Sequence, residues 1–259
     1  MALPRRKQNF MEGAAVLTLA VAATKVIGAV YKNPLGNLLD KDAMAHFYVA
    51  YNIYSLLLIV STAGLPLALS RLVSRAEAMG RVNQRKRIFR VTAGVFFLLG
   101  VVCCGVMLLF AGPLAELLND GQAAPAIRML APAVLCVCML SAIRGYTQGR
   151  RDMRPTAVSQ IIESTGKLLV GLTAAWLLTR RAAAPNMCAA GAISGVTAGA
   201  AVSLLVLAVW LLRSHGGQKG ADIPDSRREI LRQVLEIGIP VTLGSVGMSL
   251  ITLLDQALV

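Results

Sequence analysis

The stretch VTAGVFFLLGVVCCGVMLLF, residues 91–110, contains no charged side chain. The hydrocarbon core of a membrane is about 30 Å thick, and a helix of roughly 20 mostly apolar residues crosses it. This stretch is therefore predicted to be a transmembrane helix. Six other apolar stretches of similar length predict further spans, which lie at Met11–Val30, Ala45–Leu69, Ala126–Ala142, Pro155–Leu178, Met187–Leu212 and Ile237–Val259.

The composition of the whole chain indicates the same class of protein. Hydrophobic residues occupy 56% of the 259 positions, and the mean hydropathy is +0.65. Both values are typical of membrane proteins rather than of soluble domains. We expect an all-α fold, a polytopic transmembrane helical bundle.

The formal net charge of +13 would suggest nucleic-acid binding in a soluble protein. Its distribution indicates another role, because 19 of the 26 lysines and arginines fall in the N-terminal segment and in alternate loops, whereas the opposite loops hold only five. The positive-inside rule then predicts a cell-membrane protein whose N-terminus and basic loops are cytoplasmic. The basic loops can also contact anionic lipid head groups. We expect membrane lipids, and no nucleic acid, as partners.

No enzyme signature is evident in the sequence. The two histidines, His46 and His215, lie at the edges of apolar stretches, and no carboxylate cluster is available for a magnesium-bound pyrophosphate. The five cysteines lie in or beside apolar stretches without a His or Asp cluster, which favours packing over a metal or redox site. We therefore expect no catalytic residue, no metal and no cofactor.

The second apolar stretch has two features that allow two interpretations each. Phe47, Tyr48, Tyr51 and Tyr54 suit an aromatic belt at the outer membrane surface, although they can also face a ligand. The Gly-Leu-Pro sequence at residues 64–66 interrupts the stretch. It is either a packing kink or a place where freed backbone groups line a cavity.

Two further patterns concern packing. The segment Ser70–Arg90 is the most basic part of the chain and is expected to form an amphipathic helix on the inner leaflet. In the sixth stretch, small residues recur every fourth position at Gly191, Gly195, Gly199 and Ser203. This spacing predicts a helix face that allows close approach of a neighbouring helix.

An ionisable side chain inside an apolar stretch costs at least about 2.5–3.5 kcal/mol to insert. Four such residues stand out: Lys25, Glu163, Lys167 and Asp255. Glu163 and Lys167 are four residues apart and share a helix face, and Lys167 is placed near the midplane. They form either a self-neutralising structural pair or the wall of a hydrophilic cavity in which Lys167 meets an anionic substrate. We favour the cavity, because apolar residues would fill a purely structural role at lower cost.

Lys25 and Asp255 are weaker candidates for functional residues. Lys25 lies a turn or two from the outer end of the first stretch, so its side chain can alternatively snorkel towards the outer head groups. Asp255 is close to the end of the chain, and it is a candidate site for a coupling cation or proton.

Several segments resemble the stage V sporulation protein B group of the polysaccharide transporter family, within the multidrug/oligosaccharidyl-lipid/polysaccharide exporter superfamily. These are residues 25–36 (KVIGAVYKNPLG), residues 64–74 (GLPLALSRLVS) and residues 144–149 (RGYTQG). The last motif continues into Met153, the run at residues 155–160 and Glu163. The matching segments occur in the expected order and extend over the chain to about Lys167.

The resemblance implies a transporter of two six-helix lobes around a central cavity. Residues 1–213 would form the N-terminal six-helix lobe, residues 214–236 a cytoplasmic linker, and residues 237–259 the first helix of a C-terminal lobe that is otherwise missing. The chain would then be a fragment or an early-terminated reading frame. The implied activity is a flippase for a lipid-linked oligosaccharide or peptidoglycan precursor on an undecaprenyl pyrophosphate-type carrier, in cell-wall assembly or sporulation.

The resemblance places Lys25 on the helix that corresponds to the family's cationic cavity. Lys167 is assigned by its depth, and Arg144 is a candidate at the inner mouth. Two other functions stay open. A drug or cation antiporter of the related multidrug and toxin extrusion family would need an acidic cavity, and a membrane scaffold for wall or spore assembly would tolerate apolar residues at Glu163 and Lys167.

Overall fold

The computed structural model describes residues 10–214 and 220–258, and the side chains of residues 11–59, 61–213 and 220–247. These residues are helical, without a β-strand, so the predicted all-α class is confirmed. The elements in chain order are α1 (Phe10–Leu38), α2 (Lys41–Thr62), α3 (Leu65–Ala78), α4 (Val82–Leu109), α5 (Ala111–Leu117), the short 3₁₀ helix η1 (Gly121–Ala123), α6 (Ala124–Gly149), α7 (Arg154–Arg180), α8 (Pro185–Ser214) and α9 (Arg227–Leu258).

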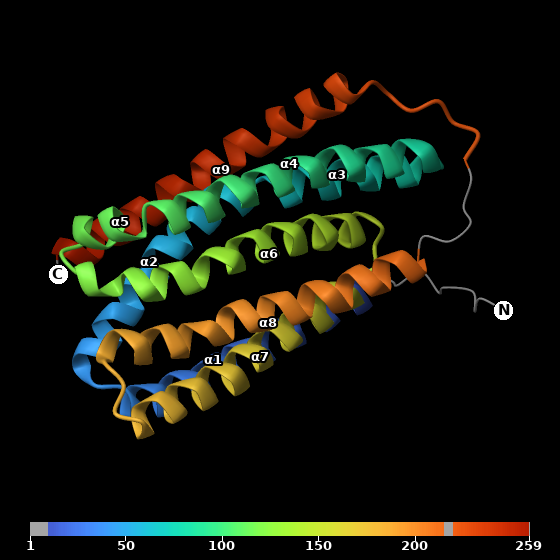
Figure 1. Cartoon of the computed structure of the whole chain (residues 1–259). Coiled ribbons are helices and arrows are strands. Elements are labelled where there is room, and N and C mark those ends of the chain that lie inside the picture. Colours follow the sequence, from blue (N-terminus) through green and yellow to red (C-terminus); the bar gives the residue numbers. More distant parts are fainter. Residues whose placement is uncertain (1–9, 215–219, 259) are drawn as a thin grey trace.

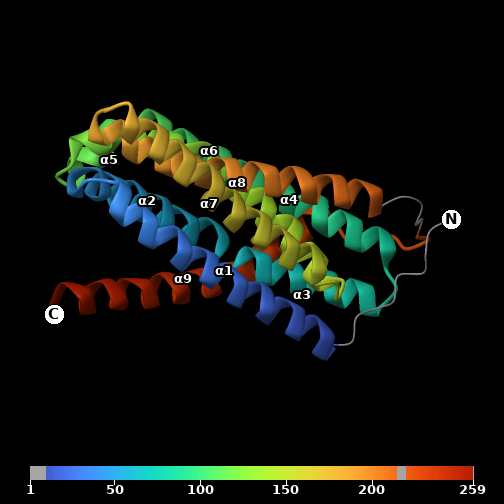
Figure 2. The same cartoon turned by 90° about the horizontal axis from the view of Figure 1, so that it is seen from below.

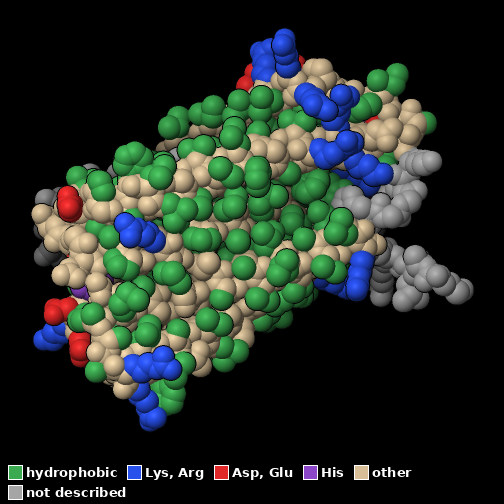
Figure 3. Space-filling view, viewed as in Figure 1, with side chains coloured by type: hydrophobic (Ala, Val, Ile, Leu, Met, Phe, Trp, Pro, Cys, Tyr) green, Lys and Arg blue, Asp and Glu red, His purple; other side chains and the backbone are tan. Residues whose placement is uncertain are grey.

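Six helices in the described part of the chain are long and apolar enough to cross a membrane, namely α1, α4, α6, α7, α8 and α9. The long helices run along one another in a bundle, with the start of α1 at one end and the end of α9 at the other (Figure 1). Hydrophobic side chains cover the middle of the visible face, while lysine and arginine side chains lie towards the ends (Figure 3). The chain is a multi-pass membrane protein.

The second predicted stretch does not form one continuous helix. α2 ends at Thr62 and α3 begins at Leu65, with Pro66 in its first turn, where a proline costs no hydrogen bond. The backbone amide of Gly64 is not left unpaired, because it donates a hydrogen bond of 3.1 Å to Thr242 Oγ1 of α9. A side chain at Gly64 would collide with the backbone of Gly238. Of the two interpretations, the structure shows a kink that packs against α9.

The basic segment Ser70–Arg90 forms the end of α3 and the start of α4. α3 is amphipathic as expected, but its apolar face packs against other helices of the bundle and not against lipid. Its apolar face, which includes Ala68, Leu69 and Leu72, is buried. This face contacts α4, α6 and α9, because a helix that continues from α2 after a kink stays within the bundle.

α6 is the central helix of the bundle. It packs against α2, α3, α4 and α8, and its side chains from Leu130 to Tyr146 include many of the fully buried residues. α7 packs on α8 and α1, while α9 diverges from α1 and α2 along its length (Figure 2). α9 begins at Arg227, earlier than the predicted residue 237. Charged residues interrupt the apolar ones in its first turns, so those turns were not counted as part of an apolar stretch.

Candidate functional site

Close packing between α7 and α8 sets the position of the polar face of α7. A side chain added at Gly195 would collide with backbone atoms of Gly171 and Lys167, and one added at Gly199 would collide with the backbone of Glu163. The predicted small-residue face is therefore confirmed. It brings the α8 backbone against the turn of α7 that carries Glu163 and Lys167.

Glu163 does not pair with Lys167 along its own helix. Its Oε2 accepts a hydrogen bond of 2.8 Å from Arg144 of α6, and Arg144 Nε also donates to Ser159 Oγ at 2.8 Å. The side chains of Arg144 and Glu163 are only 14% and 26% exposed. The alternative that we did not favour, a self-neutralising pair within α7, is therefore not formed, because the neighbouring helix brings a guanidinium that binds the carboxylate instead.

Lys167 lies at the centre of α7, about 20 Å from either end at 1.5 Å per residue. Its Nζ is 5.0 Å from the ring centroid of Tyr31 in α1 and 4.8 Å from that of Tyr51 in α2. Among the described residues it forms no ion pair. The quadrupoles of the two rings stabilise the ammonium but do not neutralise it.

Tyr51 belongs to an aromatic cluster within the bundle. Its ring stacks on Phe47 and lies against Tyr54, and both of these neighbours are buried. Tyr48 alone of the four aromatics is substantially exposed. The expected surface belt is therefore wrong for the other three, which pack inwards because α2 turns this face towards the other helices. Tyr31 is held in turn by a hydrogen bond of 3.1 Å from its hydroxyl to the Ala192 carbonyl.

Lys25 is not part of this cluster. Ala20 and Tyr31 mark the buried face of α1, and Lys25 lies more than about 100° around the helix from both, on an exposed face. α1 continues to Leu38, so Lys25 lies about 20 Å from that end of the helix. α1 is longer than the hydrocarbon core of a membrane requires, so its end does not mark the membrane surface, and snorkelling stays an alternative for Lys25. A Lys25 ammonium that does not reach the head groups must face water or another part of the protein.

Two predictions concern ions, namely a coupling site at Asp255 and the absence of a metal site. Asp255 lies on α9 but beyond residue 247, so its side chain is outside the described residues. Within the described part of the chain, no three His, Cys, Asp or Glu side chains are placed to hold a metal ion. The interior cluster, defined as Arg144, Glu163, Lys167 and the rings of Tyr31 and Tyr51, thus contains two cations and one carboxylate.

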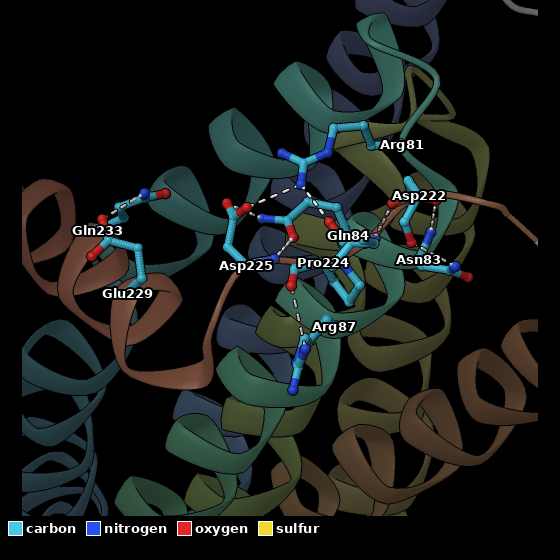
Figure 4. Close-up of polar contacts among 10 residues, drawn as sticks. Arg81, Asn83, Gln84, Arg87, Asp222, Pro224, Asp225, Glu229 and Gln233 are labelled. Carbon is cyan, nitrogen blue, oxygen red and sulfur yellow. Dashed lines mark hydrogen bonds and ion pairs between the residues drawn. The ribbon is translucent and has the colours of Figure 1, made fainter.

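A second polar network lies where the linker meets the start of α4 (Figure 4). Asp222 accepts hydrogen bonds of 2.8 Å from the backbone amides of Asn83 and Gln84, which are otherwise unsatisfied at a helix start. Asp225 binds Arg81 at 2.9 Å and Gln84 Nε2 at 2.7 Å. We call these five residues the linker clasp; no sequence pattern predicted it, because its two halves lie far apart in the chain.

The electrostatics of the clasp suit anchoring. Shielding from water raises the pKa of Asp222, but the hydrogen bonds from the amides of Asn83 and Gln84 outweigh it and hold the pKa below the usual value of 3.8. The carboxylate is therefore ionised at neutral pH, when its bonds to the amides are strongest. The clasp fixes residues 222–225 against α4 and thereby fixes where α9 starts.

Comparisons with known proteins agree with this architecture. The chain is 28% identical over 244 residues to stage V sporulation protein B of Bacillus subtilis, which covers 91% of this chain and 46% of the relative. It is 29% identical over 181 residues to the lipid II flippase MurJ of the same organism, covering 66% of this chain and 33% of MurJ. The uncharacterised membrane protein YabM is 27% identical, over 94% of this chain and 46% of that protein. The chain therefore spans half or less of the length of these relatives.

Solved structures show the same fold at low sequence identity. A MOP superfamily transporter from Pyrococcus furiosus superposes with a TM-score of 0.77 at 16% identity, over 94% of this chain and 54% of that one. An outward-facing multidrug resistance MATE family transporter superposes with a TM-score of 0.75 at 17% identity, over 92% and 53%. The profile of the polysaccharide biosynthesis protein family matches residues 10–259. Because that match extends over nearly the whole sequence, the chain belongs to the polysaccharide biosynthesis protein family.

Proposed function

We propose that this chain is the N-terminal lobe of a flippase that moves a lipid-linked oligosaccharide or peptidoglycan precursor across the cell membrane. The observation that carries the proposal is the charge of the interior cluster. Arg144 and Glu163 neutralise each other at 2.8 Å, whereas Lys167 forms no ion pair with any described residue and lies over the faces of Tyr31 and Tyr51. A net positive charge at mid-membrane depth would suit a substrate with a pyrophosphate group.

Lys25 adds a second positive charge at similar height on α1. It is exposed in this chain, and α1 contacts mainly α7, so one face of α1 is free to line a cavity. The second lobe that our proposal requires would close that cavity on the other side. In this arrangement Lys25 and Lys167 would contact the anionic group in succession rather than together, because they lie on different faces of the lobe.

The proposed orientation places the basic end of the bundle in the cytoplasm. The starts of α4, α7 and α9 carry Arg81, Arg154 and Arg227 at this end. Arg144 lies near the same end, in the last turns of α6, and would form the inner mouth of the cavity. Residues 1–213 would be the lobe, and the linker and α9 would lead into the second lobe. An ion gradient or the membrane potential would drive the cycle, with Asp255 as the candidate coupling site.

The alternative is a drug or cation antiporter, and the fold likeness to the MATE transporter favours it. The charge of the cavity distinguishes the two candidate functions. Two facing aromatic rings are a usual site for an organic cation, but here Lys167 already occupies the position between Tyr31 and Tyr51. The Pyrococcus furiosus transporter is described by a reverse polarity of its binding pocket that suggests a different function. Polarity of the cavity is therefore the property to test.

The test is complementation in cells depleted of their own lipid II flippase, with the full-length gene, both lobes included, as wild type, Lys167→Ala, Lys167→Arg and Lys25→Ala. Lys41→Ala is the matched control, because Lys41 is exposed at the start of α2, remote from the interior cluster. We expect rescue by the wild type, Lys167→Arg and the control, and loss of rescue by both alanine variants at equal expression.

Each contrary result has a distinct meaning. Failure of the wild type to rescue would exclude lipid II as the substrate and favour another lipid-linked sugar or the antiporter. Equal rescue by all variants would contradict the proposed roles of Lys25 and Lys167. If, in addition, Glu163 could be replaced by an apolar residue without loss, the scaffold function would be favoured.

A further inference from the structure

A cavity of about 760 Å³ lies between the starts of α4 and α9, remote from the interior cluster. Its rim carries four arginines and its floor is apolar. The arginines are Arg87 and Arg90 of α4, and Arg227 and Arg228 of α9. The floor is lined by Val91, Gly94, Val95 and Leu98 of α4 and by Leu231 of α9.

The two parts of the cavity follow from the register of α4. Arg87, Arg90, Val91, Gly94, Val95 and Leu98 recur at spacings of three and four, so they share one face of the helix. Moving along that face from the basic end, cations give way to apolar side chains within about three turns. A ligand that fits this gradient is anionic at one end and apolar at the other.

The arginines of the rim are not neutralised by neighbouring carboxylates. In the described part of the chain none of the four forms an ion pair, and Arg87 makes one long hydrogen bond of 3.4 Å to the Pro224 carbonyl. Three carboxylates lie nearby, and each has another partner: Asp222 binds backbone amides, Asp225 binds Arg81 and Gln84, and Glu229 accepts a hydrogen bond from Gln233. The rim therefore presents an uncompensated positive charge.

The linker clasp makes the cavity preformed. It fixes Pro224 in the rim and sets the start of α9, so Arg227 and Arg228 lie opposite Arg87 and Arg90 (Figure 4 shows Arg87 pointing to Pro224). A second cavity of about 540 Å³ shares Arg228 and Leu231 with the first and continues along α9 past Leu235 to Ile239. Mainly apolar surface thus continues from the rim along α9 as far as Ile239.

We propose that this cavity, which we call the arginine-rimmed cavity, binds an anionic phospholipid of the surrounding membrane. The phosphate would lie among Arg90, Arg227 and Arg228, and the acyl chains would follow Gly94, Leu98 and Leu231. Basic pockets between membrane helices at the cytoplasmic surface are a recognised class of site for anionic lipid head groups. A zwitterionic lipid carries a compensating ammonium and gains less from the same rim.

The experiment is a titration of the delipidated full protein in detergent by native mass spectrometry, with dioleoylphosphatidylglycerol and dioleoylphosphatidylcholine as probes. Each arginine near a lipid surface contributes about 1 kcal/mol, which is about a fivefold change in affinity. We expect phosphatidylglycerol to bind at least about fivefold more tightly than phosphatidylcholine, and Arg90→Gln/Arg228→Gln to weaken it about 25-fold. Arg71→Gln/Arg154→Gln is the matched control, because both residues are exposed and lie outside the cavity.

A steric variant tests the acyl part of the site separately. A Cβ atom at Gly94 would meet no atom of the protein within 4 Å, and Gly94 lines the cavity, so Gly94→Phe places a ring in the space proposed for the acyl chains. The same holds for Gly105 on the same helix, which lies outside the cavity and provides the control Gly105→Phe. We expect Gly94→Phe to weaken both lipids at least about fivefold, the loss for about 1 kcal/mol of apolar contact, and Gly105→Phe to change neither.

Two results would overturn the proposal. Equal affinity for the two lipids, unchanged by Arg90→Gln/Arg228→Gln, would show that the rim does not select an anion. Stronger binding of undecaprenyl phosphate than of phosphatidylglycerol, lost in the same variant, would make the cavity an entry site for the transported lipid and not a phospholipid site.

Discussion

The interior cluster and the linker clasp use the same kinds of side chain in different surroundings. In the clasp, each carboxylate has more than one donor, and two of the donors are backbone amides. In the interior cluster, the one carboxylate forms an ion pair with one of the two cations, Arg144, and Lys167 contacts only aromatic rings among these residues. The carboxylates of the clasp all have hydrogen-bond donors, whereas the interior cluster has one positive charge without a carboxylate partner, at a depth where an unpaired charge costs free energy.

This difference separates an anchoring network from a candidate binding site. A network whose donors and acceptors are all matched gains little from a ligand. An unmatched ammonium inside a bundle gains a great deal from an anion that reaches it. The comparison therefore predicts that damage to the interior cluster affects both stability and transport, while damage to the clasp affects the position of the linker.

The largest effect on stability is expected from Glu163→Ala. It leaves the Arg144 guanidinium without its carboxylate inside the membrane, which costs about 3 kcal/mol for a pair of this kind. The measurement is unfolding of the purified protein in detergent. In Arg144→Ala/Glu163→Ala we expect most of this loss to be recovered, because both charges are removed together. If the single and double variants were equally destabilised, the two residues would not be coupled.

The next effect is expected from Gly195→Ala. A methyl group at this position would collide with the backbone of Gly171 and Lys167, so α7 and α8 must separate. Overpacking of this kind costs about 1–3 kcal/mol, and it also displaces Lys167. Thermal unfolding and complementation should both be impaired. Gly105→Ala is the control, since a side chain there meets nothing within 4 Å; impairment of the control to the same degree would contradict the packing argument.

The smallest effect is expected from the clasp. Asp222→Ala removes the acceptor for the amides of Asn83 and Gln84, so their hydrogen exchange should become faster while global unfolding changes little. Asp222→Asn, which keeps one acceptor oxygen, should lie between the variant and the wild type. Unchanged exchange in Asp222→Ala would show that the linker is held by other contacts.

The clasp should also respond to acid in one direction. The pKa of Asp222 is lowered in the folded protein. The contribution of this carboxylate to stability is therefore present above pH 3.8, the usual pKa, and is lost as the pH falls through the lower pKa of the folded state. Exchange at Asn83 and Gln84, corrected for the intrinsic pH dependence, should therefore be protected equally at neutral pH and pH 5. Protection should then decrease below pH 3.8.

The sequence by itself determined the features that repeat along one helix. Apolar length predicted six of the candidate membrane spans, although the second predicted stretch, residues 45–69, is not among them. The Gly-Leu-Pro sequence at residues 64–66 predicted the break between α2 and α3, and the small residues at Gly195 and Gly199 predicted a close helix contact. Lys167 was placed at mid-membrane depth from its distance to the helix start alone. These features depend on rise, period and side-chain size within a single segment, and such properties are local.

The tertiary structure alone decided which side chains meet. Glu163 has a lysine four residues away on its own helix, yet it binds Arg144 of the neighbouring helix, because α6 brings a guanidinium with two aligned donors to Ser159 and Glu163. Helix packing also places Lys167 over the rings of Tyr31 and Tyr51, and it brings the linker into hydrogen-bonding contact with α4. Partner choice between helices depends on their relative rotation and spacing, which the local sequence pattern does not contain.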